Sequence, residues 1–223
     1  TCALPIFSFH QPVETHESIG LGTLNILEAI RMSGLSAHFY NAASSECFGD
    51  TGVDGADEQT PFRPRSPYAV AKASAFWEVA TYRDAYKLFA CSGILFNHES
   101  PLRHQRFVTQ KIVHAACLIA SGRKHVLELG DLSIQRDWGW APEYVEAMWL
   151  MLQQPQPDDY VVATGTSHSL EELVANVFDL VGLDWHDHVR INQLLFRPTD
   201  IRVSRANPAK SLHKLGWVAK YKM

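Results

Sequence analysis

The feature that most constrains the fold of this chain is an alternation of helical segments with short, almost wholly apolar segments. Residues 19–33 carry apolar side chains at helical spacing and stop before Gly34, which favours helix termination. The alternation then continues as far as residue 163. The expected helices are 19–33, 68–86, 107–120 and 142–152, and the expected strands are 37–43, 88–97, 126–129 and 160–163.

Strands that alternate with helices form parallel sheets through right-handed crossovers. The sequence therefore predicts the α/β class, with a doubly wound, Rossmann-like parallel sheet that binds ligands at the carboxyl ends of its strands. Beyond Gly165 the strand signals weaken. Ser169, with Glu172 three residues later, predicts a capping box that starts a helix ending near Gly182. The part from about Thr166 is expected to form a small lid.

Composition excludes several classes of function. The chain has 223 residues, 46% hydrophobic and 20% charged, so it can bury a substantial core. Its 20 Lys and Arg residues against 24 Asp and Glu residues give a net charge of −4, which offers no footprint for nucleic acid or an anionic membrane. Apolar runs such as 88–96 are far shorter than the roughly 20 residues that span a bilayer. A small, local ligand is the expected partner.

Candidate metal ligands are few. His186 and His188 have no evident third partner, so they are interpreted as surface residues and no metal site is predicted. The cysteines contain no C-x-x-C pair and no secretory leader is visible, which favours reduced thiols and a cytoplasmic location. These cysteines are Cys2, Cys47, Cys91 and Cys117. The start at Thr1, inside an apolar stretch, suggests that upstream sequence is missing.

Tyr68 and Lys72 are the first candidates for chemistry. Four residues apart on an expected helix, they emerge from one face about a turn apart. A neighbouring ammonium lowers the pKa of a phenol, which normally lies near ~10, toward the range where it can accept a proton from an alcohol. The alternative is an exposed Tyr beside a solvated Lys, an arrangement common on helices.

Ser44, Ser45 and Glu46 follow an expected strand at its carboxyl end, where such a sheet binds its ligand. A hydroxyl there can hydrogen-bond a substrate oxygen, and a carboxylate can move a proton next to a carbonyl. The alternative is that Ser44 and Glu46 only cap the following turn.

Taken together, these segments resemble the extended short-chain dehydrogenase/reductases and, within them, the GDP-mannose 4,6-dehydratase family. The resemblance covers nearly the whole chain in order. NHESP and RDWG are specific to this family, whereas Y-x-x-x-K is shared across the superfamily. The residues that carry it are AASSECFG at 42–49, TPFRPRSPYAVAK at 60–72, FACSGILFNHESPLR at 89–103, FVTQKI at 107–112, RDWG at 136–139, DDYVVATG at 158–165 and FRPTD at 196–200.

The resemblance implies a reaction and a role for each candidate. Tyr68 is then the base of the hydride step and Lys72 its partner, Ser44 replaces the family's Thr beside the reacting hydroxyl, and Glu46 is the acid/base carboxylate. NADP oxidises C4 of GDP-mannose, Glu46 removes the C5 proton, water leaves from C6, and the hydride returns to C6. The product is GDP-4-dehydro-6-deoxy-mannose, which implies a place in GDP-fucose biosynthesis.

The resemblance also implies the binding residues and the domains. His98 and Arg103 match cofactor positions at the nicotinamide and the adenosine 2′-phosphate, and the planar fork of Arg suits a phosphate. Residues 1–165 would form the main part of the NADP-binding domain and 166–223 the substrate domain, with 98–125 on the substrate side. Relatives form homodimers or homotetramers. The residues that match positions around GDP-mannose are Asn97, Lys111, Arg136 and Arg197.

One departure keeps other functions open. No G-x-x-G-x-x-G follows a first strand, so the turn that holds a cofactor pyrophosphate is not in this sequence, and Gly20 and Gly22 do not replace it. The chain also stops soon after the LGW at 215–217, where relatives continue. The alternatives are another nucleotide-sugar epimerase or reductase of the same fold, which would not need Glu46, and a non-catalytic binding protein.

Overall fold

Three parallel strands lie at the centre of the larger half of the molecule, in a computed structural model that describes residues 5–196 and 199–223. Their spatial order is β1 (Phe39–Ser44), β2 (Ala90–Leu95) and β6 (Tyr160–Val162). Every residue of β2 is buried, as expected for the middle strand of a sheet covered on both faces. The strands predicted at 37–43, 88–97 and 160–163 are confirmed, with ends that shift by one or two residues.

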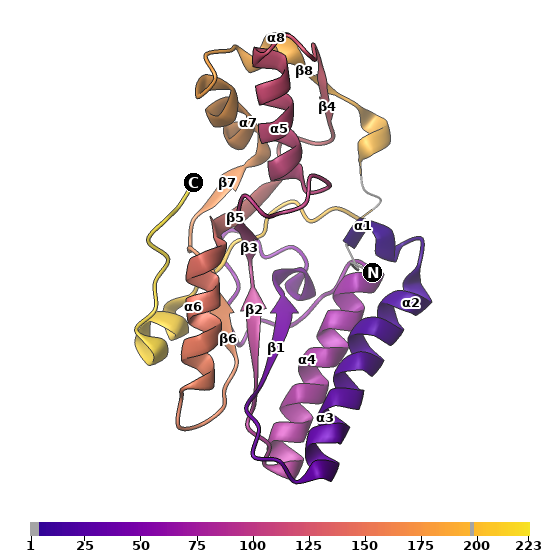
Figure 1. Cartoon of the computed structure of the whole chain (residues 1–223), viewed down its shortest axis with the longest axis vertical. Coiled ribbons are helices and arrows are strands. Elements are labelled where there is room, and N and C mark those ends of the chain that lie inside the picture. The colour runs from indigo at the N-terminus through magenta and orange to yellow at the C-terminus, as the bar shows by residue number, and fades with distance from the viewer. Residues whose placement is uncertain (1–4, 197–198) are drawn as a thin grey trace.

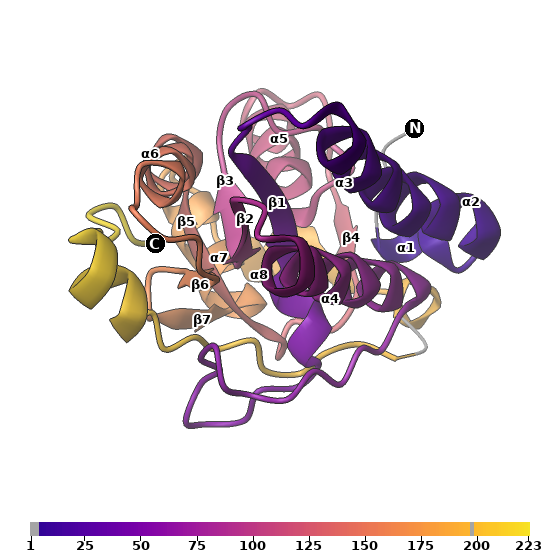
Figure 2. The same ribbon diagram turned by 90° about the horizontal axis from the view of Figure 1, so that it is seen from below.

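Helices cover both faces of this sheet (Figures 1 and 2). On one face lies α4 (Pro67–Tyr86), whose Phe76 packs with Ile94 and Val161. Next to it lies α3 (Gly22–Ser33), which ends at Gly34 with φ of 66°, the left-handed conformation that favours glycine.

The opposite face packs against α6 (Ala141–Leu152). Its Tyr144 packs with Leu95 and Val162, whose side chains alternate with those that face α4. The doubly wound α/β arrangement is therefore confirmed. We call this half, with β1, β2, β6, α3, α4 and α6, the sheet lobe.

The other half, the small lobe, lies above the sheet lobe in Figure 1. It forms around a separate apolar core that includes Ile112, Leu127, Val174 and Phe178. Two of its short strands pair in parallel. Its elements are α5 (Val108–Ala120), β4 (Leu127–Leu129), α7 (Leu170–Asp179), α8 (Trp185–His188) and β8 (Val189–Ile191).

The predicted start of α7 is confirmed in detail. The Ser169 hydroxyl accepts a hydrogen bond from the backbone N–H of Glu172 at 3.0 Å, and the Glu172 carboxylate accepts one from the N–H of Ser169 at 2.7 Å. These two bonds form the capping box.

A second sheet, which the sequence did not predict, joins the lobes. Its order is β3 (Asn97–Glu99), β5 (Gln135–Trp140) and β7 (Ser167–Ser169). β5 is a strand although Arg136 and Asp137 interrupt any apolar pattern. Its extended form is stabilised by pairing with β3 and β7, which are distant in sequence and leave no local signal. Short helices α1 (Pro5–Ser8) and α2 (Pro12–His16) precede α3.

The end of the chain returns to the sheet lobe. Trp217 packs against Tyr144, and its indole N–H donates to the carbonyl oxygen of Glu143 at 2.9 Å. The Glu143 carboxylate accepts hydrogen bonds from the backbone N–H groups of Lys220 and Tyr221. No helix within the described residues is both long and apolar enough to cross a bilayer.

Candidate active site at the carboxyl end of β1

Tyr68 and Ser44 meet where β1 ends. Ser44 is the last residue of β1, and its hydroxyl accepts a hydrogen bond from the N–H of Glu46 at 3.3 Å. Tyr68 lies in the first turn of α4, which starts after the N-cap Ser66 with Pro67 in its first turn. The hydroxyls of Tyr68 and Ser44 share a hydrogen bond. Ser44 therefore both caps a turn and contacts the candidate base.

Lys72 lies beside Tyr68, as the four-residue spacing predicts. Its ammonium is 5.9 Å from the centre of the Tyr68 ring and donates a hydrogen bond to the carbonyl oxygen of Ala42 at 2.8 Å. Burial lowers the pKa of Lys72. An ammonium fixed to a strand carbonyl next to the phenol leaves two further N–H donors for a ligand.

The acidity of Tyr68 differs from the sequence expectation. Burial raises the pKa of Tyr68, the nearby Glu46 carboxylate adds to this effect, and the hydrogen bond with Ser44 and the charge of Arg103 oppose it. The expectation that Lys72 would lower this pKa below its ordinary value is wrong for the free protein. Loss of water around the phenolate outweighs the charge of Arg103 and the hydrogen bond with Ser44.

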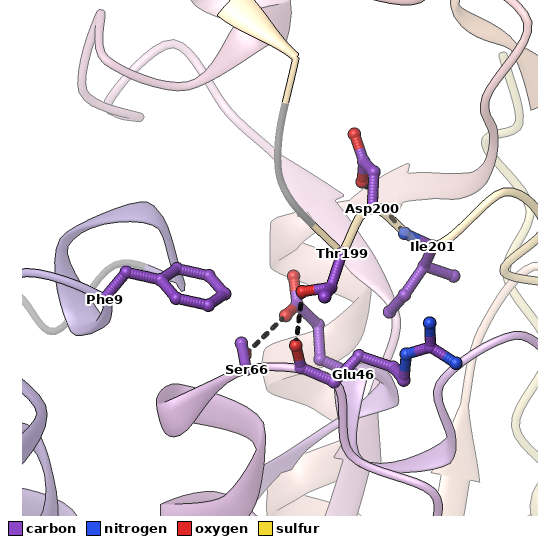
Figure 3. A pocket seen from close by; sticks show the side chains of 7 residues that line it. Phe9, Glu46, Ser66, Thr199, Asp200 and Ile201 are labelled. Carbon is purple, nitrogen blue, oxygen red and sulfur yellow. Dashed lines mark hydrogen bonds between the residues drawn. The ribbon is translucent and has the colours of Figure 1, made fainter.

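Glu46 lines a small, open hollow that Figure 3 shows from close by. The hydroxyl of Ser66 donates to Glu46 Oε2 at 3.5 Å, and Thr199 Oγ1 donates to the carbonyl oxygen of Arg65 at 2.6 Å. The sequence predicted Glu46 but missed its neighbours, although the Ser-Pro pair at the start of α4 could have indicated Ser66. The other lining residues are Phe9, Asp200 and Ile201.

His98 and Arg103 follow β2 and lie close to the same edge. The His98 ring nitrogen Nδ1 is 2.9 Å from the carbonyl oxygen of Phe96, and the ring stacks on Tyr144 at 4.8 Å. Burial lowers the pKa of His98, so the neutral ring is favoured. The Arg103 Nη1 donates to the carbonyl oxygen of His98 at 2.8 Å.

The four candidate substrate residues are held in different places. Asn97 begins β3, directly beyond β2. Lys111 lies on α5 in the small lobe, where its ammonium donates to the carbonyl oxygen of Glu128 at 2.6 Å. Arg136 reaches toward the hollow, because its Nη2 donates to Asp200 at 3.0 Å. Arg197 lies outside the described residues.

The thiols and the two histidines have ordinary surroundings. Burial raises the pKa of Cys47, beside Glu46, to about 12, so its thiol stays protonated. Within the described residues, Cys47, Cys91 and Cys117 are free. His186 is exposed and lies 2.7 Å from Asp184, while His188 is half-buried against Phe178. No group of three or more possible metal ligands occurs among the residues that the structure describes.

Comparison with known proteins gives a consistent result. A family model described as GDP-mannose 4,6 dehydratase matches residues 6–223. GDP-mannose 4,6 dehydratase 1 of Arabidopsis thaliana is 48% identical over 217 residues, which are 96% of this chain and 60% of that protein. The GDP-mannose 4,6-dehydratase of Sinorhizobium fredii is 44% identical over 229 residues, 94% of this chain and 65% of that protein. The chain thus spans about three fifths of the length of these relatives.

Solved structures share the fold. The structure of RMD from Pseudomonas aeruginosa complexed with NADPH has a TM-score of 0.88 at 23% identity, covering 98% of this chain and 73% of that one. The Thermus thermophilus UDP-glucose 4-epimerase complex with NAD has a TM-score of 0.86 at 27% identity, covering 99% and 71%. These likenesses extend over both lobes.

Proposed function

Because the chain belongs to the GDP-mannose 4,6-dehydratase family, we propose that this protein converts GDP-mannose to GDP-4-dehydro-6-deoxy-mannose. The observation that carries the proposal is the meeting of Ser44, Tyr68 and Glu46 at the carboxyl end of β1. Oxidation needs a group that takes the proton of an alcohol, which the hydroxyls of Tyr68 and Ser44 can provide. The elimination that follows needs a carboxylate that removes a proton from carbon, which Glu46 can provide.

The residues present fit one end of a nicotinamide cofactor, and we propose NADP. The Lys72 ammonium has donors left for ribose hydroxyls, and Tyr68 and the neutral His98 lie at the same edge. A bound cofactor would supply the hydride acceptor for the oxidation and the hydride for the last step. Support comes from the similar fold of RMD, whose structure contains NADPH.

Tyr68 and Ser44 would act in the oxidation. Ser44 holds the Tyr68 hydroxyl by a hydrogen bond, which would position the phenolate form of Tyr68 to take the proton of the sugar C4 hydroxyl. Since burial raises the pKa of Tyr68, its phenolate would form only with cations beside it, such as Lys72 and Arg103, and would then accept the alcohol proton readily. Lys72 orients ligand hydroxyls from its fixed place on Ala42.

Glu46 would act in the elimination. A keto group at C4 makes the C5 proton acidic, and the Glu46 carboxylate in the open hollow can accept it. The same group then gives a proton to the departing C6 hydroxyl, so that water leaves and the carboxylate is restored. Ser66 keeps Glu46 in place through its hydroxyl.

Binding of GDP-mannose would use both lobes. We propose that Asn97, Lys111, Arg136 and Arg197 surround it, with the cations next to its diphosphate. The division expected from the sequence, with 1–165 mainly on the cofactor side and 98–125 and 166–223 on the substrate side, stays a prediction. A homodimer or homotetramer and a cytoplasmic location stay predictions as well.

The test replaces Glu46 by Gln in the full-length protein. Glu46→Gln keeps the size of the side chain but cannot accept a proton, so elimination should slow by about 10²- to 10⁴-fold while C4 oxidation survives. A single-turnover mixture with NADP and GDP-mannose should accumulate NADPH absorbance and a 4-keto sugar that retains its 6-hydroxyl.

Glu171→Gln is the matched control, because Glu171 is exposed in the first turn of α7. It should react like the parent protein. Formation of the 6-deoxy product by Glu46→Gln at the parent rate would show that Glu46 only caps a turn. An epimerase or reductase of the same fold would be the better assignment if the parent protein itself formed no 6-deoxy product.

A further inference from the structure

The side chain of Arg103 is held unusually firmly for a residue in a loop. Its guanidinium lies over the ring of Phe107, with Cζ 3.7 Å from the ring centre. Nε lies 3.0 Å from Glu99 Oε2 in an ion pair that does not meet hydrogen-bond geometry, and Nη1 donates to the carbonyl oxygen of His98. The aromatic face, the carboxylate and the carbonyl give the guanidinium three contacts that restrict its rotation.

Glu99 has a second partner. The Thr109 hydroxyl donates to the same carboxylate oxygen, Oε2, at 2.6 Å. The side chains of Glu99 and Arg103 are only 20% and 19% exposed. Burial raises the pKa of Glu99, while the charge of Arg103 and the hydrogen bond from Thr109 oppose that rise. Because burial disfavours the charged form of Glu99, the carboxylate depends on Arg103 and Thr109 to remain ionised.

The edge of Arg103 that remains is the Nη2 amino group. Among residues 5–196 and 199–223, no acceptor takes a hydrogen bond from it. The guanidinium is hydrogen-bonded to His98, which follows the end of β2 at the edge where Leu95 pairs with Ser44, so it lies close to the candidate active site. Its free donors are thus available to an anionic group that binds there.

We infer that Glu99 is a positioning residue: together with Thr109 it holds Arg103 so that the free Nη2 edge faces a bound cofactor. The inference rests on the proposed function for the identity of that cofactor. The resemblance indicates a role for Arg103 alone, whereas this arrangement makes Thr109, Glu99 and Arg103 one unit that links α5 of the small lobe to the cofactor side.

The first arm of the test needs no ligand. In the full-length protein, the Nε–Hε signal of Arg103 in a ¹H–¹⁵N spectrum, assigned by its absence in Arg103→Met, should be sharp. Glu99→Gln removes the charge and should broaden or abolish the signal, whereas Thr109→Ser, which retains the hydroxyl, should preserve it. An unchanged signal in Glu99→Gln would overturn the positioning role.

The second arm measures NADPH affinity by titration calorimetry. Glu99→Gln and Arg103→Met should each weaken binding about tenfold, the order expected for one hydrogen bond to a charged group. If Glu99 acts through Arg103, the double variant binds no more weakly than Arg103→Met. Additive losses would overturn the inference.

The two arms separate this inference from the proposed function. If the parent protein binds no NADPH, the cofactor proposal fails, while loss of the Arg103 signal in Glu99→Gln still supports the positioning role. If NADPH binds and both single variants bind it like the parent, Arg103 is outside the cofactor site and the inference fails. Circular dichroism on each variant shows whether the fold is retained.

Discussion

The two lobes fix their candidate functional residues in different ways. In the sheet lobe, Tyr68 and Ser44 contact each other through side chains, at a place set by the end of β1 and the start of α4. In the small lobe, Lys111 is bonded to the main-chain carbonyl of Glu128. On the proposed function, the sheet lobe contributes side chains that already contact each other, whereas the small lobe contributes a cation that is bonded to a main-chain carbonyl.

The largest expected effect tests Tyr68 in the sheet lobe. Tyr68→Phe removes the phenol and the hydrogen bond with Ser44 but keeps the ring, so C4 oxidation should fall by about 10⁴-fold while GDP-mannose affinity stays nearly unchanged. Stopped-flow NADPH absorbance measures the step. Tyr86→Phe, which removes a hydroxyl near the end of the same helix, serves as control. Undiminished turnover of Tyr68→Phe would mean that Tyr68 is not the base.

A second prediction asks whether the lobes are separate folding units. Phe178 is fully buried in the core of the small lobe, so Phe178→Ala should cost about 3–5 kcal/mol of stability. Amide hydrogen exchange should show lost protection in α5 and α7, while β2 keeps its protection. Leu180→Ala, at a side chain that is 85% exposed, should change little. Equal loss of protection in both lobes would show a single cooperative unit.

A third prediction tests whether Lys111 contacts the ligand. Lys111→Met should weaken GDP-mannose binding about tenfold and leave kcat unchanged at saturation, because a binding contact made equally in ground and transition states affects KM alone. Calorimetry and steady-state rates measure the two quantities. Lys124→Met is the control, since Lys124 lies near enough to lower the pKa of Lys111 and carries the same charge. Equal effects in both variants would indicate only long-range electrostatics.

The sequence predicted the features that depend on neighbouring residues and missed those that depend on the whole fold. The spacing of Tyr68 and Lys72 and the position of Ser44 after a buried strand are local signals, and the structure brings these residues together. β5 was missed because its strand character depends on pairing with β3 and β7 rather than on its own residues. The pKa direction of Tyr68 was missed because burial is a property of the whole fold.

The smallest effect concerns the start of α7, where a local signal in the small lobe was sufficient. Ser169→Ala removes the acceptor for the N–H of Glu172 and should cost about 1 kcal/mol, with Ser169→Asp restoring most of it. The hydrogen bond from the Ser169 N–H is the main reason that the pKa of Glu172 is lowered. A carboxyl with a lowered pKa in the folded state stabilises the fold above its unfolded pKa, and this contribution is lost as the pH falls through the folded pKa.

The difference in stability between the parent and Glu172→Gln should therefore be largest near neutral pH and should shrink as the pH falls below about 4, the ordinary range of a Glu pKa. Urea denaturation at several pH values measures it. Glu171→Gln is the control, because Glu171 lies in the same turn but is not part of the capping box. A difference that stays constant with pH would mean that Glu172 contributes through packing rather than through its charge. Packing against the core of the small lobe, rather than the capping box, would then stabilise the start of α7.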